Sequence, residues 1–224
     1  MKHVDHIINE REVLQFLSDK DRRYRGENLR DDDSDADRSA VPECLTSQSY
    51  QKITSSALPA KDQRCPFLMG IYSSFQDKEN LYFELQYIQG CTLLSQIREY
   101  NQVVQTNMAY YAGEVLLALG YLHSNNIIYR DLKPENIVIS MTERGHIKLV
   151  DFGFAKRLKA RNQRTHTNCG TPAYIAPEVL RGHNGHGYEA DIWSLGVLMV
   201  EIVSGQTPFQ AETTQGVYEK INLC

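Results

Sequence analysis

The 224-residue sequence has no excess of basic residues: 24 Lys and Arg stand against 28 Asp and Glu, for a net charge of −4. Because binding to nucleic-acid phosphates depends mainly on Lys and Arg, this balance argues against a nucleic-acid-binding protein. The sequence also lacks an apolar run near the ~20 residues that a membrane-spanning helix needs. Its longest run, residues 195–200, ends at Glu201. We therefore expect neither nucleic-acid nor membrane partners.

Cysteine pairs are missing as well. The five cysteines are scattered and form no C-x-x-C pair, and no apolar stretch of a secretory signal follows Met1. An odd, scattered set of cysteines without a signal predicts reduced thiols and a cytoplasmic location. His183 and His186 lack further ligands at metal-binding spacing, so their Gly- and Asn-rich context predicts an exposed loop rather than a zinc site.

The residue pattern divides the chain into four parts. Residues 1–17 predict an amphipathic helix, with apolar positions at helical spacing over 4–17. Residues 18–64 show little periodicity and blocks of like charge, which predicts a disordered insertion. Residues 65–88 predict two strands, 67–75 and 80–88, joined by a polar turn. Residues 89–224 predict a mainly helical region.

Within this last part, apolar residues predict one long helix over 108–122 and a helix over 192–203 that is buried nearly all round. Short strands are expected at 137–139 and 147–150. Because strands come first and helices later, the order predicts an α+β fold.

The residues that carry chemistry lie in three motifs in a fixed order. The octet YRDLKPEN occupies positions 129–136, DFG occupies 151–153, and APE occupies 176–178. A single Asp in such a place is usually a turn or capping residue, but the three motifs together are specific. They resemble the signature of protein kinases, with Tyr129 in place of the usual His.

Phosphoryl transfer suits this spacing, because it needs cations, positioned positive groups and one acceptor for the hydroxyl proton. Asp131 can accept the proton of a substrate hydroxyl. Asn136 and Asp151 supply the hard oxygen ligands that Mg²⁺ prefers. Lys133, two residues after Asp131, can balance charge on the γ-phosphate. These residues are the candidate catalytic and metal-binding set.

Longer segments (129–136, 150–156 and 168–174) resemble the AGC group of serine/threonine kinases, and above all the cyclic-nucleotide-dependent kinases. The likeness covers residues 2–17 and 65–223, and Lys133 and Thr171 match the Ser/Thr signature. It implies a two-lobe kinase fold, ATP and Mg²⁺ as cofactors, and protein or peptide substrates. The 1–17 helix would then be the αC helix of the N-lobe, residues 65–88 the remaining N-lobe strands and hinge, and residues 89–224 the C-lobe.

The resemblance also implies roles around the nucleotide. Glu10 matches the helix glutamate that pairs with an ATP-binding lysine. Leu85 falls on the gatekeeper position, and Val138 falls beneath the adenine. The hinge that reads adenine through its backbone matches Gln86, Tyr87 and Ile88. A stacked apolar spine between the lobes matches Leu14, Ile71, Tyr129 and Phe152, for which plain core packing is a compatible reading.

Regulation and substrate choice are implied in the same way. Thr167 matches an activation-loop phosphosite for an upstream kinase, with Thr165 as a weaker rival. The cationic contacts of its phosphate match His6, Arg130 and Lys156. Substrate binding matches Thr171 together with Glu135 and Glu201, the last two as the pair that holds an arginine two residues before the target. Thr92 and Ala173 stand where the family has glutamates, so a looser basic requirement is expected at the outer positions.

Some elements of the family are missing. No G-x-G-x-x-G precedes Glu10, and no strand lysine does either. The resemblance places an arginine partner of Glu178 beyond residue 224. We therefore expect a kinase domain truncated at both ends, without most of the N-lobe sheet and the C-terminal helices, and weak or inactive alone. The alternative is a catalytically inactive kinase-fold scaffold that acts by binding proteins.

Overall fold

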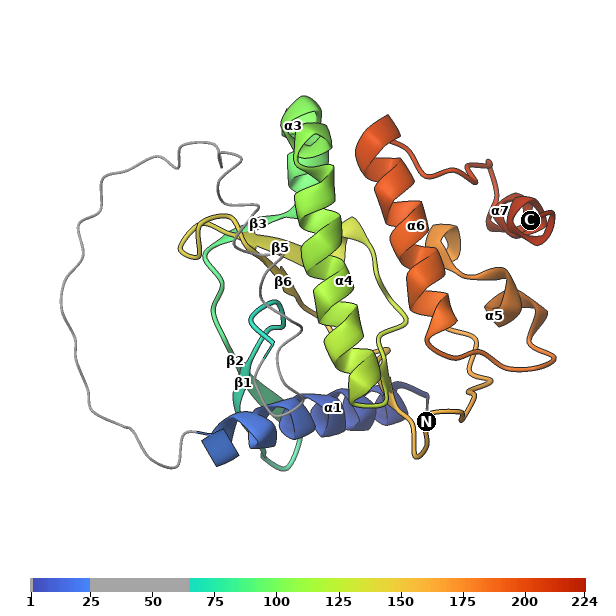
Figure 1. Cartoon of the computed structure of the whole chain (residues 1–224). Coiled ribbons are helices and arrows are strands. Elements are labelled where there is room, and N and C mark those ends of the chain that lie inside the picture. The colour runs from blue at the N-terminus through green and yellow to red at the C-terminus, as the bar shows by residue number, and fades with distance from the viewer. Residues whose placement is uncertain (1, 25–64) are drawn as a thin grey trace.

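The computed structural model describes residues 2–24 and 65–224 (Figure 1). The expected N-terminal helix is present, and α1 spans Lys2–Tyr24. Residues 18–24 are thus helical, although the sequence predicted that a disordered insertion begins at 18. They are rich in Lys and Arg, whose helix propensity allows the helix to continue without apolar periodicity. The rest of that expected insertion, 25–64, lies outside the described residues.

Two antiparallel strands follow, β1 (Ile71–Gln76) and β2 (Leu81–Leu85), in a register that sets Phe75 opposite Tyr82. Both are shorter than expected. The turn between them is held by Asp77, whose Oδ1 accepts hydrogen bonds from the backbone N–H groups of Glu79 (2.8 Å) and Asn80 (2.6 Å). Helix α1 lies beside β1 across one end of the molecule, as Figure 1 shows.

The C-terminal part is mainly helical. Its α-helices are α3 (Leu93–Thr106), α4 (Met108–Ser124), α5 (Pro177–Arg181), α6 (Glu189–Ser204) and α7 (Thr214–Asn222). Two short 3₁₀ turns are η1 (Pro134–Asn136) and η2 (Pro172–Tyr174). Helices α4 and α6 contact each other and lie side by side in Figure 1. The long helix predicted at 108–122 is confirmed.

Short strands build two further sheets within the described residues. An antiparallel sheet joins β3 (Gly90–Thr92), β5 (Ile137–Ser140) and β6 (Ile147–Leu149), and a second pair joins β4 (Ile127–Ile128) to β7 (Lys156–Arg157). Glycine is required at position 90, where β3 pairs with β5, because a Cβ there would lie 2.0 Å from the carbonyl oxygen of Ile139. Helices with small antiparallel sheets make the fold α+β, as predicted.

Helix α6 is not buried all round, contrary to the sequence-based prediction. Leu198 and Ile202 are buried, whereas Ile192, Val200 and Val203 are 48%, 43% and 53% exposed. One face of α6 packs on α3 and α4. The η2 turn also packs on α6, while Ile192, Val200 and Val203 remain at the surface. Within the described residues, no helix is both long and apolar enough to cross a membrane.

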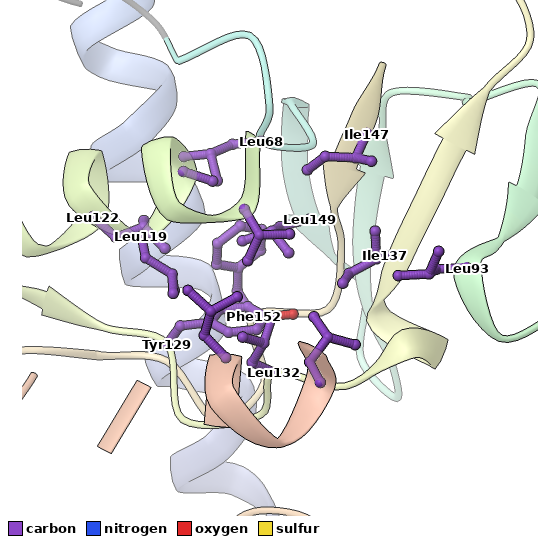
Figure 2. Close-up of a cluster of buried hydrophobic side chains, with 14 of the residues drawn as sticks. Leu68, Leu93, Leu119, Leu122, Tyr129, Leu132, Ile137, Ile147, Leu149 and Phe152 are labelled. Carbon is purple, nitrogen blue, oxygen red and sulfur yellow. The ribbon is translucent and has the colours of Figure 1, made fainter. Parts of the chain in front are cut away.

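The hydrophobic core runs from α1 through the β5–β6 hairpin to α4 and α6. The four expected spine residues, Leu14, Ile71, Tyr129 and Phe152, are all buried in this one cluster. The rings of Tyr129 and Phe152 meet edge to face, with 5.6 Å between their centroids. Figure 2 shows both rings among the side chains of Leu119, Leu132 and Leu149. The core therefore reaches the two segments that carry the YRDLKPEN and DFG motifs.

Candidate active site

The loop that carries the YRDLKPEN motif begins at the end of β4 and is held by α6. Asp191, in the first turn of α6, has no exposed surface. Its Oδ2 accepts a hydrogen bond from the backbone N–H of Tyr129 (2.9 Å), and its Oδ1 accepts one from that of Arg130 (2.8 Å). His123 Nε2 lies 2.7 Å from Oδ2. These contacts fix the loop at Arg130, where the backbone adopts a positive φ of 69°.

Asp131 follows directly and is 3% exposed. Its Oδ2 accepts hydrogen bonds from Lys133 Nζ (2.8 Å) and Asn136 Nδ2 (2.9 Å). Its Oδ1 accepts a hydrogen bond from the Thr171 hydroxyl (2.8 Å). Lys133 Nζ also donates to Thr171 Oγ1 at 3.0 Å. The structure thus brings the expected catalytic residues together and adds Thr171, which comes from a segment forty residues away.

Asn136 and Asp151 lie at the same end of the β5–β6 hairpin, because the backbone N–H of Val150 donates to the Asn136 carbonyl oxygen (3.0 Å). Asn136 Nδ2 donates to the backbone carbonyl oxygen and to Oδ2 of Asp131, both at 2.9 Å. Asp151 is exposed, with φ at 57°, and its Oδ1 accepts the backbone N–H of Gly153 at 3.0 Å. Among the described residues, no three His, Cys, Asp or Glu side chains form a metal-binding cluster.

Glu10 of α1 reaches this same turn. Burial, and secondly the nearby Asp151 carboxylate, raise the pKa of Glu10, while a hydrogen bond from the Phe152 backbone lowers it. In the part of the chain that the structure describes, Glu10 forms no ion pair with a lysine. The structure therefore sets α1 against the DFG turn.

The expected hinge lies at the end of β2. Gln86 is bound to Gly70 twice: its backbone N–H donates to the Gly70 carbonyl (2.8 Å), and its Oε1 accepts the Gly70 N–H (3.2 Å). Leu85 and Tyr87 are exposed, and Ile88 is half-buried. Val138 is half-buried on β5, opposite Thr92 of β3.

Two cations, Arg130 and Lys156, lie near each other and near Cys169, two residues after the expected phosphosite Thr167. Arg130 Nε donates to the Phe154 carbonyl (2.6 Å), but its buried Nη1 has no hydrogen-bond partner among the described residues. Lys156 Nζ donates to Thr165 Oγ1 at 3.0 Å. Burial lowers the pKa of both groups, and Arg130 lowers that of Lys156 further. The side chain of His6, the third expected cation, lies outside the described part.

The two threonines of this segment differ sharply. Thr165 is 3% exposed, and its backbone pairs with His186, whereas Thr167 is exposed. This pairing also buries His186, which the sequence predicted to be in an exposed loop. Burial, followed by the charge of Arg130, lowers the pKa of His186 to about 4. The Gly and Asn residues around His186 are typical of exposed loops, so no local pattern indicated this burial.

The expected substrate carboxylates also lie near each other. Tyr174 donates its hydroxyl to Glu201 Oε2. Burial raises the pKa of Glu201, and the negative charge of Glu135 raises it further. Glu135 is exposed on η1, and Glu201 is half-buried on α6. The two carboxylates, which come from different elements, therefore interact electrostatically.

Comparison with known proteins gives the same answer as the motifs. The protein kinase domain family matches residues 42–224. The chain belongs to the protein kinase family. It is similar to a cAMP-dependent protein kinase catalytic subunit of Dictyostelium discoideum, 44% identical over 156 residues (70% of this chain and 23% of the relative). Human cAMP-dependent protein kinase catalytic subunit PRKX is 40% identical over 182 residues (81% and 49%). Human putative serine/threonine-protein kinase PRKY is 40% identical over 182 residues (81% and 64%). The chain thus spans between 23% and 64% of these AGC-type relatives.

Asp191 is the site residue of this kinase segment that sequence reasoning missed. It stands in the sequence at the head of the apolar run that forms α6, in Asp191-Ile192-Trp193. A carboxylate at the head of an apolar helix run must find donors if it is buried, because an unpaired buried charge is costly. This signal was available, but its partners lie about sixty residues earlier and follow only from the fold.

Glu178 of the APE motif lies in an apolar groove of about 790 Å³, together with Trp193, Val200 and Phe209. The rings of Trp193 and Phe209 stack at 5.7 Å between centroids. Within the described residues, Glu178 forms no ion pair, and the buried Trp193 Nε1 has no acceptor. The arginine partner that the family resemblance implies for Glu178 stays a prediction.

Proposed function

We propose that this chain is the catalytic segment of a serine/threonine protein kinase, which transfers the γ-phosphate of ATP to protein substrates. One observation carries the proposal. The buried carboxylate of Asp131 is held by Lys133, Asn136 and Thr171, and the Asn136 carbonyl binds the N–H of Val150, the residue before the exposed Asp151. A general base must be fixed within hydrogen-bond reach of the proton that it accepts, and this network fixes it.

Each residue then has a defined task. Asp131 orients the Ser or Thr hydroxyl and accepts its proton at a carboxylate oxygen. Lys133 supplies a positive charge at 2.8 Å from Asp131, beside the place where phosphate charge is transferred. Thr171 holds the activation segment against the base, so the peptide groove and the catalytic loop keep one geometry. The protein contributes chiefly positioning and charge, as phosphoryl transfer requires.

Magnesium fits the donors that this chain offers. Mg²⁺ in kinase sites takes one or two carboxylates together with phosphate oxygens. Asp151 offers an exposed carboxylate and Asn136 an amide oxygen at the same hairpin end. When bound, the ion would neutralise negative charge on the phosphates.

For the nucleotide, we assign the adenine to the hinge Leu85, Gln86 and Ile88 with Val138 beneath it, and a supporting role to Glu10. The two hydrogen bonds between Gln86 and Gly70 support this assignment, because they fix the backbone that would read the base.

We assign phosphorylation by an upstream kinase to Thr167. It is exposed, whereas Thr165 is buried and already bound to Lys156. The unsatisfied Nη1 of Arg130 and the ammonium of Lys156 are suited to a phosphate, which adds about −1.5 to −2 charge. His6 completes the cations that the family resemblance implies. Such a phosphate would join the activation segment to the catalytic loop.

We also propose a basophilic kinase that acts on cytoplasmic substrates. Glu135 and Glu201 offer the paired carboxylates that a guanidinium binds bidentately. Thr92 and Ala173, in place of family glutamates, leave the outer positions without charge.

The substrate assignment is tested on a positional peptide array with the chain extended at both ends by the matching segments of human PRKX. We expect the strongest dependence on arginine two residues before the target, and a weaker one at three. Glu201→Gln should reduce the preference at two, whereas Glu212→Gln, at an exposed position in the segment before α7, should not. A dominant requirement at three, or a preference for acidic flanks, would contradict the roles of Glu135 and Glu201.

The alternative function is a kinase-fold scaffold without catalysis. The observation that favours it is the state of Glu10, which lies at the DFG turn and has no lysine partner within the described residues. We expect negligible phosphotransfer by residues 1–224 alone and transfer by the extended form. If the extended form folds and transfers no phosphate, the scaffold is correct. If the isolated chain phosphorylates peptides at normal rates, the expected truncation is wrong.

A further inference from the structure

Helix α1 is attached to the molecule on two sides. On one side, Gln15 Nε2 donates to Ser74 Oγ (3.0 Å) and Ser18 Oγ donates to the carbonyl oxygen of Ile71 (3.2 Å), which ties α1 to β1. On the other side, α1 contacts β7. There the guanidinium carbon of Arg157 lies 3.8 Å from the centroid of the Phe16 ring.

This contact has the geometry of a cation–π interaction, which acts within about 6 Å of a ring centroid. Arginine keeps its charge at every physiological pH, and its planar guanidinium stacks well on aromatic rings. Phe16 is half-buried and Arg157 is exposed, so the pair lies at the surface between α1 and β7. The interaction is therefore weak, and its importance lies in the position in which it holds α1 relative to β7.

Arg157 is itself fixed to the catalytic loop. In the β4–β7 ladder, Arg157 stands opposite Ile127 and Lys156 stands opposite Ile128. Ile128 directly precedes Tyr129, where the YRDLKPEN motif begins. On its other side, β7 follows closely after Gly153 of the DFG turn. A contact between α1 and Arg157 therefore links the position of α1 to the positions of both motifs.

Glu10 lies on the same helix, six residues before Phe16, or about 9 Å along the axis. Its carboxylate lies at the DFG turn, because a Cβ placed on Gly153 would stand 3.8 Å from Glu10 Oε2. If α1 slides or rotates relative to β7, this carboxylate moves away from the turn. Leu14, between the two, is buried in the core but gives no directional contact.

We propose that Phe16 and Arg157 are a positioning pair, which sets α1 against β7 and so keeps the Glu10 carboxylate at the DFG turn. Its benefit to phosphotransfer rests on the proposed kinase function. The positioning itself does not, and it can be measured without nucleotide or substrate.

The test is amide hydrogen exchange of the 224-residue chain, followed residue by residue by NMR. Phe16→Leu keeps an apolar side chain but removes the ring. We expect exchange of the Phe152 amide to become about two- to five-fold faster, the equivalent of an exposed cation–π contact. The Leu119 amide in α4 should keep its rate, since it reports general stability. Arg157→Gln should match Phe16→Leu, and the double variant should add nothing further.

Rescue separates positioning from plain packing. Phe16→Tyr keeps the ring and should keep the wild-type exchange rate at Phe152. An unchanged rate in Phe16→Leu, or equal acceleration at Phe152 and Leu119, overturns the proposal, as does a Phe16→Tyr variant that behaves like Phe16→Leu. A chain that shows the expected exchange but never transfers phosphate would instead contradict the proposed function alone.

Discussion

The catalytic loop and the neighbouring activation segment handle charge in opposite ways. In the loop, the carboxylates of Asp131 and Asp191 each accept hydrogen bonds at both oxygens from the protein itself. Beside them, Arg130 of the loop and Lys156 of the activation segment carry positive charge at low exposure, and Arg130 Nη1 has no acceptor within the described residues. The protein thus satisfies the two buried carboxylates itself, whereas the described residues leave Arg130 Nη1 without an acceptor.

Arg130 belongs to both regions, which explains how they are coupled. Its backbone N–H is held by Asp191, while its side chain extends to Phe154 next to the DFG turn. A phosphate that binds the guanidinium would therefore act on a residue whose backbone is already fixed. The difference between the regions suggests that catalytic geometry is built in by folding, and that activation adds charge balance.

The largest effect is expected when the buried hydrogen bonds that Asp191 accepts from the catalytic loop are removed. Asp191→Ala leaves the buried N–H groups of Tyr129 and Arg130 without an acceptor, at about 1–3 kcal/mol each. We expect the free energy of unfolding, from urea titration, to fall by about 2–6 kcal/mol.

The matched control is Asp77→Ala in the β1–β2 turn, where a carboxylate also accepts several hydrogen bonds but is exposed to water. Its effect should be clearly smaller. Equal losses in the two variants would show that the burial of Asp191 is not what holds the loop.

The two threonines of the activation segment, Thr165 and Thr167, give a second contrast. Thr167→Glu places a carboxylate on an exposed side chain near Arg130 and Lys156, so stability should be kept or slightly raised. Thr165→Glu forces a larger charged group into a buried position, which costs about 1–3 kcal/mol. Thermal unfolding of both variants checks this, and a Thr167→Glu variant less stable than Thr165→Glu would place the anion site elsewhere.

A smaller effect is expected from pH. The pKa of His186 is lowered to about 4 in the folded chain, against an ordinary value of 6.5. Its contribution to stability is therefore present above pH 6.5 and is lost as the pH falls from 6.5 towards 4, since the unfolded chain takes up the proton first.

His186→Asn should remove part of this pH dependence in urea midpoints measured across that window. His183→Asn, in the same loop but exposed, should leave the slope unchanged. If both variants keep the wild-type slope, His186 does not titrate as its burial requires.

Linear motifs made some features predictable and left others out of reach. Asp131 and Asn136 are five residues apart on one loop, so their proximity could be inferred from spacing alone. The α+β class and the 108–122 helix followed from periodicity. Asp191, the burial of His186 and the exposed face of α6 depend on which distant segments meet, and no local pattern encodes those meetings. The Phe16–Arg157 contact joins residues 141 positions apart and belongs to the same group.

The central claim is that Asp131 acts as the base of a kinase reaction in a loop that folding has already completed. The direct measurement is steady-state transfer of the ATP γ-phosphate to an arginine-containing Ser peptide by the PRKX-extended chain and its Asp131→Asn variant. Asn keeps the size of the side chain but cannot accept the proton, so kcat should fall by about 10²–10⁴-fold. The KM for ATP should stay nearly constant. An Asp131→Asn variant that folds normally and keeps the wild-type kcat would contradict the account.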